Sequence, residues 1–198
     1  KYLEEKNVKG AGDLYDITGK PPGARTLEGY LFPDTYEFYT DATAADVVAK
    51  MKKTMDEKIP GQWRAAASEA GREWDGIITM ASIIEEEVRG ARDRKIVAGI
   101  FWKRVDNKWG LQADSTVNYI TGGNKPSVSS KDLENDSPYN TYKYRGMPPG
   151  PIGSPSLEAI EAAVFPEQTD YWYFLTSPEG KVYYGRTLEE HGANRKYL

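Results

Sequence analysis

Three consecutive carboxylates follow an apolar stretch of the chain. They are Glu85, Glu86 and Glu87. The apolar residues before and after them recur at helical spacing, at Ile77, Met80, Ala81, Ile84 and Val88. At about 100° per residue, Glu86 points away from this stripe, while Glu85 and Glu87 lie on its two flanks. Burial on a flank raises the pKa of a carboxyl, and such a group can serve as a general acid.

The same carboxylates also have a purely structural interpretation. Acids near the end of a helix are often solvated, and Glu87 could pair with Arg94 or with another neighbour. Perturbed acids mark functional sites only with some probability. The geometry of the helix does not distinguish Glu85 from Glu87 as the candidate acid.

A second polar cluster follows a glycine at position 110. Its side chains could form hydrogen bonds with a polyhydroxylated ligand, and they belong to Gln112, Asp114, Ser115, Thr116 and Asn118. A structural alternative explains the same residues, because Asp114 could cap a helix over residues 115–120.

A third cluster lies in a long segment rich in Pro, Gly, Tyr and Asn, residues 137–155. It contains the run Tyr139, Asn140, Thr141 and Tyr142, followed by GMPPGPI at residues 146–152. Prolines restrict such a loop and hold its side chains in place. Long ordered loops are usually functional, so we expect a binding loop here, although a rigid surface connection would show the same pattern.

Composition excludes several classes of protein. The 198 residues include 26 basic and 30 acidic side chains, a net charge of −4 that favours neither nucleic acid nor anionic lipid as a partner. The absence of cysteine excludes a thiol nucleophile, iron–sulfur ligation and cysteine-bound zinc. The single histidine, His191, excludes a zinc site with several histidines, and we expect it to be a solvated surface residue. Nothing indicates a metal or cofactor.

The patterning predicts an α+β protein that is mostly helical. Helices are expected over residues 43–58, 62–70, 75–88, 92–107, 156–164 and 187–195, with Asp75 and Ser156 as caps and a short helix near Lys131. Residues 171–176 and 181–184 flank a turn and predict a small antiparallel hairpin. Residues 27–39 should be extended or irregular because Pro33 interrupts them. The longest apolar stretch, residues 76–84, is too short to cross a bilayer.

Five motifs, in order, resemble those of the YceG-like family of endolytic murein transglycosylases. They are LEGYLFPDTY at residues 27–36, ASIIE at 81–85, LQADSTV at 111–117, SPYNTY at 137–142 and GMPPGPI at 146–152. The closing stretch with Tyr173, Phe174, His191 and Asn194 also fits. The resemblance covers nearly the whole chain from about residue 24 onward.

The resemblance implies a lysozyme-like catalytic core that cleaves peptidoglycan within the glycan strand. The bond cleaved would be the β-1,4 bond from N-acetylmuramic acid to N-acetylglucosamine, leaving a 1,6-anhydro end. The family's catalytic glutamate closes the ASI[IV]E motif, which corresponds to Glu85 here. Substrate contacts are then expected from Gln112, Asp114, Ser115, Thr116, Tyr139, Asn140 and Tyr142, with Glu28 and Asp34 as weaker candidates. Glu28 could instead support the loop, and Asp114 would be the first candidate partner if the enzyme were a hydrolase.

The resemblance also implies an organisation for the parent protein. Residues 1–24 would be the tail of an upstream LysM-like region with a linker, and residues 25–198 the catalytic domain. We expect the sequence to be part of a single-pass protein at the extracytoplasmic face of the bacterial membrane. Its partners would be peptidoglycan strands and cell-wall synthases such as penicillin-binding proteins, with no nucleic acid.

Two other functional classes remain open. One is a non-catalytic glycan-binding module that uses the same tyrosines with Trp102 or Trp109. The other is a scaffold that recruits synthases and in which Glu85 has lost its role.

Overall fold

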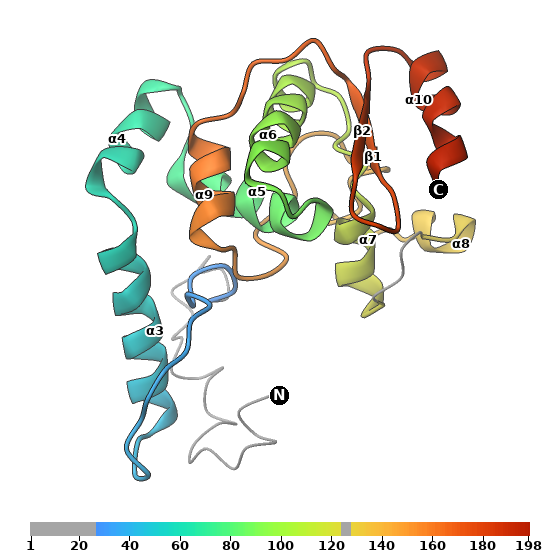
Figure 1. The fold of residues 1–198 in the computed structure, drawn as a ribbon. Helices are drawn as coiled ribbons and strands as arrows, with labels where there is room; N and C mark the ends of the chain where they lie inside the picture. Colours follow the sequence, from blue (N-terminus) through green and yellow to red (C-terminus); the bar gives the residue numbers. More distant parts are fainter. Residues whose placement is uncertain (1–26, 124–127) are drawn as a thin grey trace.

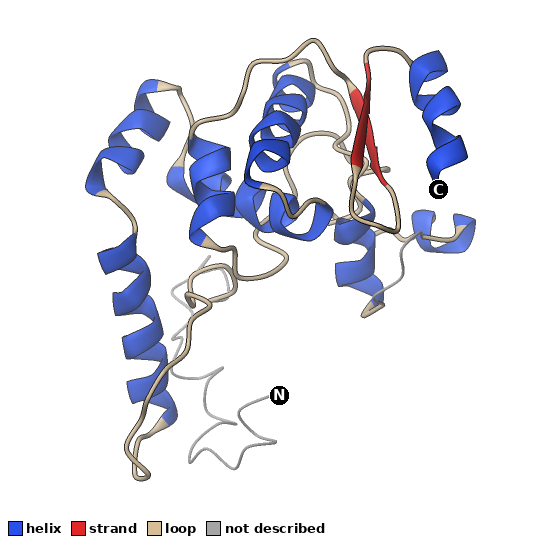
Figure 2. Ribbon diagram, in the orientation of Figure 1, coloured by secondary structure: helices blue, strands red, loops and turns tan. Residues whose placement is uncertain are grey.

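The computed structural model describes residues 27–123 and 128–198, and the expected linker at residues 1–24 lies outside this part of the chain. Within it, helices pack around a central helix and a two-stranded hairpin lies to one side (Figures 1 and 2). The elements run in the order α3 Ala44–Lys58, α4 Gly61–Glu69, α5 Trp74–Glu87, α6 Ala91–Asp106, α7 Asp114–Thr121, α8 Ser130–Leu133, α9 Leu157–Val164, β1 Tyr173–Thr176, β2 Val182–Gly185, α10 Leu188–Asn194 and η2 Arg195–Tyr197.

Helix α5 forms the centre of the core. Every residue from Ile77 to Ile84 is buried, because α9 and α6 both pack against this helix. A helix that is apolar on all sides needs such cover. Its polar Ser82 is satisfied internally, since its Oγ donates to the carbonyl of Thr79 at 2.7 Å and accepts from the amide of Ile152 at 3.0 Å. The second of these bonds fastens the long loop to the core helix.

The N-terminal part of the described chain forms an arm. Residues 27–43 run beside α3, which projects away from the other helices (Figure 1). Thr43 begins α3 with a reciprocal capping box: its side chain accepts from the amide of Asp46, whose carboxylate accepts from the amide of Thr43. The arm meets the core at Gly29, where φ is +83° and a Cβ would lie 2.5 Å from Pro151, so only glycine fits there.

The hairpin pairs β1 with β2 in antiparallel register, with Tyr173 opposite Gly185 and Thr176 opposite Val182. Phe174 of β1 meets Phe101 of α6 edge to face, with ring centroids 5.5 Å apart. Helix α10 lies along the other side of the hairpin (Figure 2). The hairpin is therefore held between α6 and α10.

The α+β class, the hairpin, the helix ranges to within two residues and the Ser156 cap are confirmed. Two expected caps are wrong. Asp75 lies inside the first turn of α5 and accepts from the Tyr30 hydroxyl, and Asp114 is the first residue of α7, with Ala113 before it. His191 is also not a freely solvated residue, because its ring is half-buried and stacks on Tyr173 at 5.3 Å.

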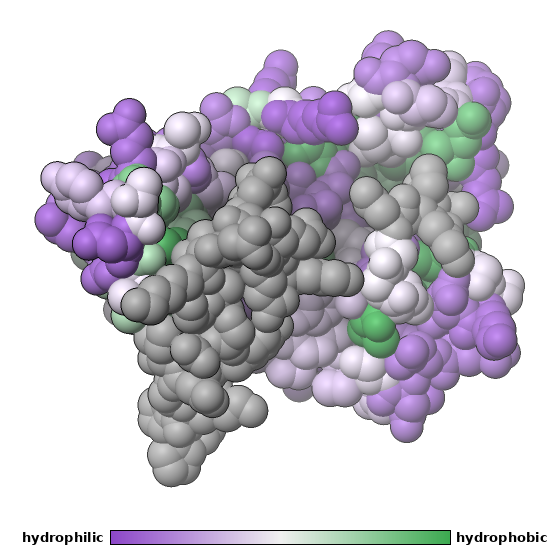
Figure 3. All heavy atoms as spheres, turned by 90° about the horizontal axis from the view of Figure 1, so that it is seen from below, coloured by the Kyte–Doolittle hydropathy of each residue, from purple (hydrophilic) through white to green (hydrophobic). Residues whose placement is uncertain are grey.

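In the view from below, the parts of the surface that are not drawn in grey are mainly hydrophilic, with small separate apolar patches (Figure 3). No helix in the described ranges is both long and apolar enough to cross a membrane. Residues 137–155 form the expected long ordered loop, which contains no helix.

Candidate functional site

Glu85 joins three helices. Its Oε1 accepts from Arg94 Nη2 of α6 at 2.8 Å, and its Oε2 accepts from both the amide and the hydroxyl of Ser156, the residue that caps α9. Arg94 is itself 6% exposed and pairs with Glu158 at 2.6 Å. Both oxygens of Glu85 are therefore already engaged by the protein. The expected pairing of Arg94 with Glu87 is wrong, because Arg94 pairs with Glu85 and Glu158.

Glu87 lies one half-turn further along α5, on the side of α7. Its Oε1 accepts from the Ser115 hydroxyl at 2.7 Å and from the Ser115 amide at 3.4 Å. Its Oε2 has no hydrogen-bond partner in the described part of the chain. Burial raises the pKa of Glu87, the nearby charge of Asp114 raises it further, and the Ser115 hydrogen bonds and Arg104 oppose the rise. This is the environment in which a carboxyl can retain its proton.

Asp114 and Tyr142 lie next to Glu87 and are bonded to each other. The Tyr142 hydroxyl donates to Asp114 Oδ1 across the space from the long loop to α7. Burial, followed by this hydrogen bond, raises the pKa of Tyr142, so the hydroxyl keeps its proton. The two partly exposed side chains form a polar rim beside Glu87.

Arg104 of α6 is buried behind this rim. Its Nη1 donates to the carbonyl of Leu111, and its Nε and Nη2 donate to the carbonyl of Trp172 at 3.0 and 2.6 Å. Its positive charge lowers the pKa of Glu87 and acts in the same direction on Tyr142. Sequence reasoning missed Arg104, because its position inside an ordinary amphipathic helix gives no signal of long-range contacts.

Asn140 and Thr116 hold the loop instead of facing a ligand. Asn140 is fully buried; its Nδ2 donates to the carbonyls of Leu133 and Asn135 at 2.9 Å each, and its Oδ1 accepts from the Tyr142 amide at 3.1 Å. Thr116 is also fully buried, and its hydroxyl bonds to that of Thr141 at 2.9 Å. The direct substrate contacts expected of these two side chains do not fit their burial.

Gln112 is exposed and has an unusual backbone conformation. Its φ is +52°, a left-handed conformation that costs a residue with a Cβ about 1 kcal/mol or more. Its amide donates to the carbonyl of Thr141 at 3.2 Å, and the next amide, of Ala113, donates to the Thr141 hydroxyl at 3.1 Å. Thr141, which lies in the expected binding loop but was not among the expected substrate contacts, therefore fixes the turn that presents Gln112 and begins α7.

Glu28 and Tyr139 both contact Tyr119 of α7. Glu28 accepts from the Tyr119 hydroxyl at 2.6 Å, and the Tyr119 and Tyr139 rings lie 4.9 Å apart. Asp34 is further away along the arm, in an exposed ion pair with Lys58 at 2.9 Å. The structure thus groups Asp114, Ser115 and Tyr142 around Glu87, places Glu28 with Tyr139 as a second cluster, and separates Asp34 from both.

No group of three or more His, Cys, Asp or Glu side chains within the described ranges could hold a metal ion. Of the two tryptophans considered as sugar platforms, Trp102 is 6% exposed and its Nε1 donates to the carbonyl of Ala163. Trp109 is half-buried, so it alone of the two can meet a ligand.

Comparisons with protein-family models, curated proteins and solved structures all find relatives of the same kind. The model of the YceG-like family matches residues 2–197. An endolytic murein transglycosylase of Bacillus subtilis is 42% identical over 188 residues, covering 94% of this chain and 51% of that protein. One of Streptococcus pneumoniae is 36% identical and covers 91% of this chain and 34% of that protein. A crystal structure of a yceG-like protein from Listeria monocytogenes, 41% identical, superposes with a TM-score of 0.80 over 90% of this chain and 60% of that one. The chain thus spans about a third to a half of these curated relatives.

Proposed function

Because this chain belongs to the YceG-like family, we propose that it is the catalytic part of an endolytic peptidoglycan lytic transglycosylase in which Glu87, not Glu85, is the general acid. The observation that supports the choice is the difference in hydrogen bonding between the two carboxylates. Glu85 has both oxygens engaged by Arg94 and Ser156, whereas Glu87 is fixed through one oxygen only and burial raises its pKa.

The proposed reaction needs a single carboxyl group. Protonated Glu87 donates to the glycosidic oxygen as the bond from that oxygen to C1 of N-acetylmuramic acid breaks, through an oxocarbenium-like transition state. The leaving sugar departs with a free 4-hydroxyl. The Glu87 carboxylate then takes the proton of the muramic C6 hydroxyl as its oxygen attacks C1. This closes the 1,6-anhydro ring, restores the acid and consumes no water.

The neighbouring groups have defined tasks in this proposal. Ser115 holds Oε1 of Glu87 and leaves Oε2 for the substrate. Asp114 and Tyr142 form a rim that can bind sugar hydroxyl or N-acetyl groups, and exposed Gln112 extends it. Asn140 and Thr116 contribute by holding the loop. Activity should fall as the pH rises through the elevated pKa of Glu87, because the donor is then ionised.

The test compares three neighbouring variants on purified peptidoglycan. Anhydro-muropeptides are measured by mass spectrometry for Glu87→Gln, Glu85→Gln and Glu86→Gln, the last being a control on the exposed face of the same turn. Loss of a general acid costs about 10²- to 10⁴-fold in rate, so Glu87→Gln should release almost no product. Glu85→Gln should stay active wherever it is folded.

Four results would overturn parts of this proposal. Full activity of Glu87→Gln would remove Glu87 from its role, and a folded but inactive Glu85→Gln would return the role to the residue that the ASIIE motif indicates. Hydrated reducing ends from the wild type would make the protein a hydrolase, with Asp114 as the first candidate partner. Binding of glycan without turnover under any condition would make it a binding module or scaffold.

The cellular setting is part of the same proposal. Peptidoglycan lies outside the cytoplasmic membrane, so we place the protein at the extracytoplasmic face, in a membrane-anchored parent with a LysM-like region upstream of residue 25. Cell-wall synthases are the proposed protein partners, and cleavage would limit the length of new strands. Co-purification of a penicillin-binding protein with the full-length parent, lost when the parent is removed from the membrane, is the expected result.

A further inference from the structure

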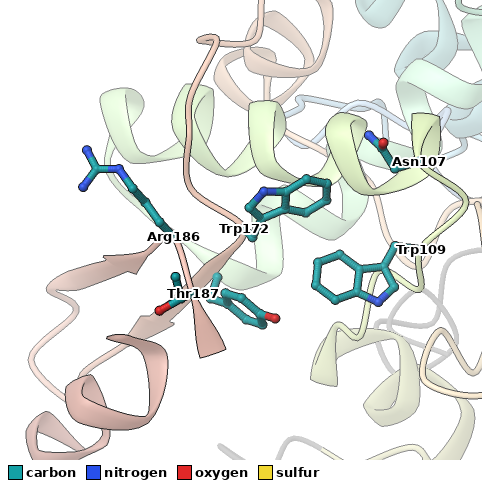
Figure 4. A pocket seen from close by; sticks show the side chains of 6 residues that line it. Asn107, Trp109, Trp172, Arg186 and Thr187 are labelled. Atoms are coloured by element: carbon teal, nitrogen blue, oxygen red, sulfur yellow. The ribbon is translucent and has the colours of Figure 1, made fainter. Parts of the chain in front are cut away.

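A pocket of about 330 Å³ lies where the end of α6 meets the hairpin. Trp172 and Trp109 pack against each other edge to face and together form one wall of it (Figure 4). Six residues line it: Asn107, Trp109, Trp172, Tyr173, Arg186 and Thr187. A volume near 300 Å³ is at the lower end for small-molecule sites, which suits one or two small rings. None of the residues assigned to the reaction above contributes to its lining.

The aromatic walls of the pocket are rigid. The Trp109 ring meets Trp172 at 5.0 Å and Tyr173 at 5.7 Å, at interplanar angles of 66° and 83°. Lys103 Nζ covers the Trp172 ring at 4.4 Å. Edge-to-face contacts of this kind fix ring positions, so the walls are organised before any ligand arrives. Polar groups of Asn107 and Thr187 lie at the margin of these walls.

The pocket is connected to Glu87 through Arg104. The Arg104 guanidinium lies 5.5 Å from the Trp109 ring and 5.7 Å from the Tyr173 ring, and its charge also acts on Glu87 and Tyr142. The chain itself joins the two places, because five steps from Trp109 to Asp114 span at most about 18 Å. One buried side chain and one short segment therefore separate the pocket from the proposed acid.

We infer that this pocket is an outlying saccharide subsite, which binds a sugar ring of the glycan strand at a distance from the bond that is cleaved. This inference rests on the proposed function. A pyranose presents C–H groups on its faces and hydroxyl groups around its rim, which matches aromatic walls with a polar margin. An enzyme that cuts inside a strand must hold sugars beyond the reacting pair, and the pocket supplies such a place.

The charges around the pocket favour a sugar over a stem peptide. A peptide carboxylate would call for a cation aimed into the pocket. The Arg186 side chain instead points away from the two tryptophans (Figure 4), and its guanidinium stacks over Tyr171 at 5.2 Å. Lys103 lies over the face of Trp172, and its Nζ donates to the carbonyl of Thr169 at 2.9 Å.

The experiment measures binding without cleavage. Glu87→Gln is the background, and its affinity for peptide-free peptidoglycan glycan strands is measured by calorimetry, with and without Trp109→Ala. Loss of an aromatic wall should weaken binding about tenfold, and Trp109→Phe should restore most of it. Tyr39→Ala, at an 89% exposed residue on the arm, is the matched aromatic control and should change nothing.

Each outcome decides the inference. The inference would be overturned if the Glu87→Gln protein bound glycan strands equally well with and without Trp109→Ala. A loss of affinity seen only with peptide-bearing material would also overturn it, and would assign the pocket to stem peptides. If Trp109→Ala does not fold, Asn107→Ala at the exposed margin should still weaken binding severalfold, and no change there would count against the subsite. Cleavage by Glu87→Gln during these measurements would refute the proposed acid, while the comparison of affinities would still test the pocket.

Discussion

Glu85 and Glu87 are two residues apart on one helix, and the structure gives them opposite surroundings. Glu85 faces two further helices and exchanges hydrogen bonds with Arg94 and Ser156 through both oxygens. Glu87 faces α7 and the long loop, bonds through one oxygen to Ser115, and has its pKa raised by burial. A carboxylate with both oxygens satisfied stabilises packing, whereas a half-buried one with only one oxygen bonded is available for chemistry.

The comparison also predicts which substitutions should affect stability and which should affect activity. Residues around Glu85 connect α5, α6 and α9, so changes there should affect unfolding first. Residues around Glu87 connect a helix end to a surface loop, so changes there should affect turnover first. Each prediction below either sharpens this division or would remove it.

The largest expected effect concerns Arg94. Arg94→Met removes the ion pairs to Glu85 and Glu158 and leaves a partly buried carboxylate without its cation, which should lower the free energy of unfolding by about 3 kcal/mol. Chemical denaturation measures this. Arg72→Met is the control, because the Arg72–Asp106 pair is more exposed and should be worth about 1 kcal/mol or less.

A second substitution sharpens the Arg94 result. Arg94→Met with Glu85→Gln removes the unpaired charge as well, so the double variant should recover part of the lost stability and retain activity. Loss of activity in a double variant that is stable would instead show that the Glu85 cluster takes part in the reaction.

Tyr142→Phe should affect turnover more than stability. It removes the hydroxyl that donates to Asp114, a bond to a charged group worth about 1.5–3 kcal/mol, and we expect kcat to fall about tenfold. The Asp114 charge, no longer shared with the hydroxyl, should raise the pKa of Glu87 further and move the alkaline limit of activity upward.

Tyr144→Phe is the matched control for this substitution. It lies in the same loop, and its hydroxyl donates to exposed Asp136 at 2.7 Å, away from Glu87. An equal loss of kcat in both variants, with unchanged pH profiles, would mean that the loop acts only as a structural unit.

Local patterns predicted the elements well. Val47 and Val48 are buried at the spacing that predicted α3, and Thr43, the first residue of the expected helix, forms its cap. Helix geometry placed Glu86 on the exposed face and the other two acids on the flanks, as the structure has them. These results depend on neighbours within one or two turns, which the sequence displays directly.

The choice between the flanking acids could not be made in this way. The family motif ends at Glu85, and the distinction depends on Ser156 and Ser115, which lie far along the chain from α5. Asn140 illustrates the same limit. The sequence pattern of a polar residue in a rigid loop is the same in two cases. The side chain can face a sugar or, as here, it can be buried with its amide bonded to the carbonyls of Leu133 and Asn135.

Glu87→Gln should stabilise the protein at neutral pH. The raised pKa of Glu87 means that the folded state disfavours its ionised form, so stability falls as the pH rises from the ordinary value of about 4.5 through the elevated one. A neutral amide avoids that cost and should add about 1 kcal/mol to the free energy of unfolding near neutral pH. Below about pH 4.5 the gain should disappear, and a pH-independent gain would contradict the sign of the shift.

The smallest effect is expected at Gln112. Its φ of +52° favours glycine, so Gln112→Gly should relieve strain, although the added freedom of the unfolded chain offsets part of the gain and leaves about 0.5 kcal/mol. Lys108→Gly, at φ +56°, is the matched control outside the proposed site. Thermal unfolding should show similar gains for both variants, but KM should rise only for Gln112→Gly, because only that side chain extends the rim beside Glu87. Equal KM values would remove Gln112 from substrate binding and confine the reactive region to Asp114, Ser115, Tyr142 and the acid itself.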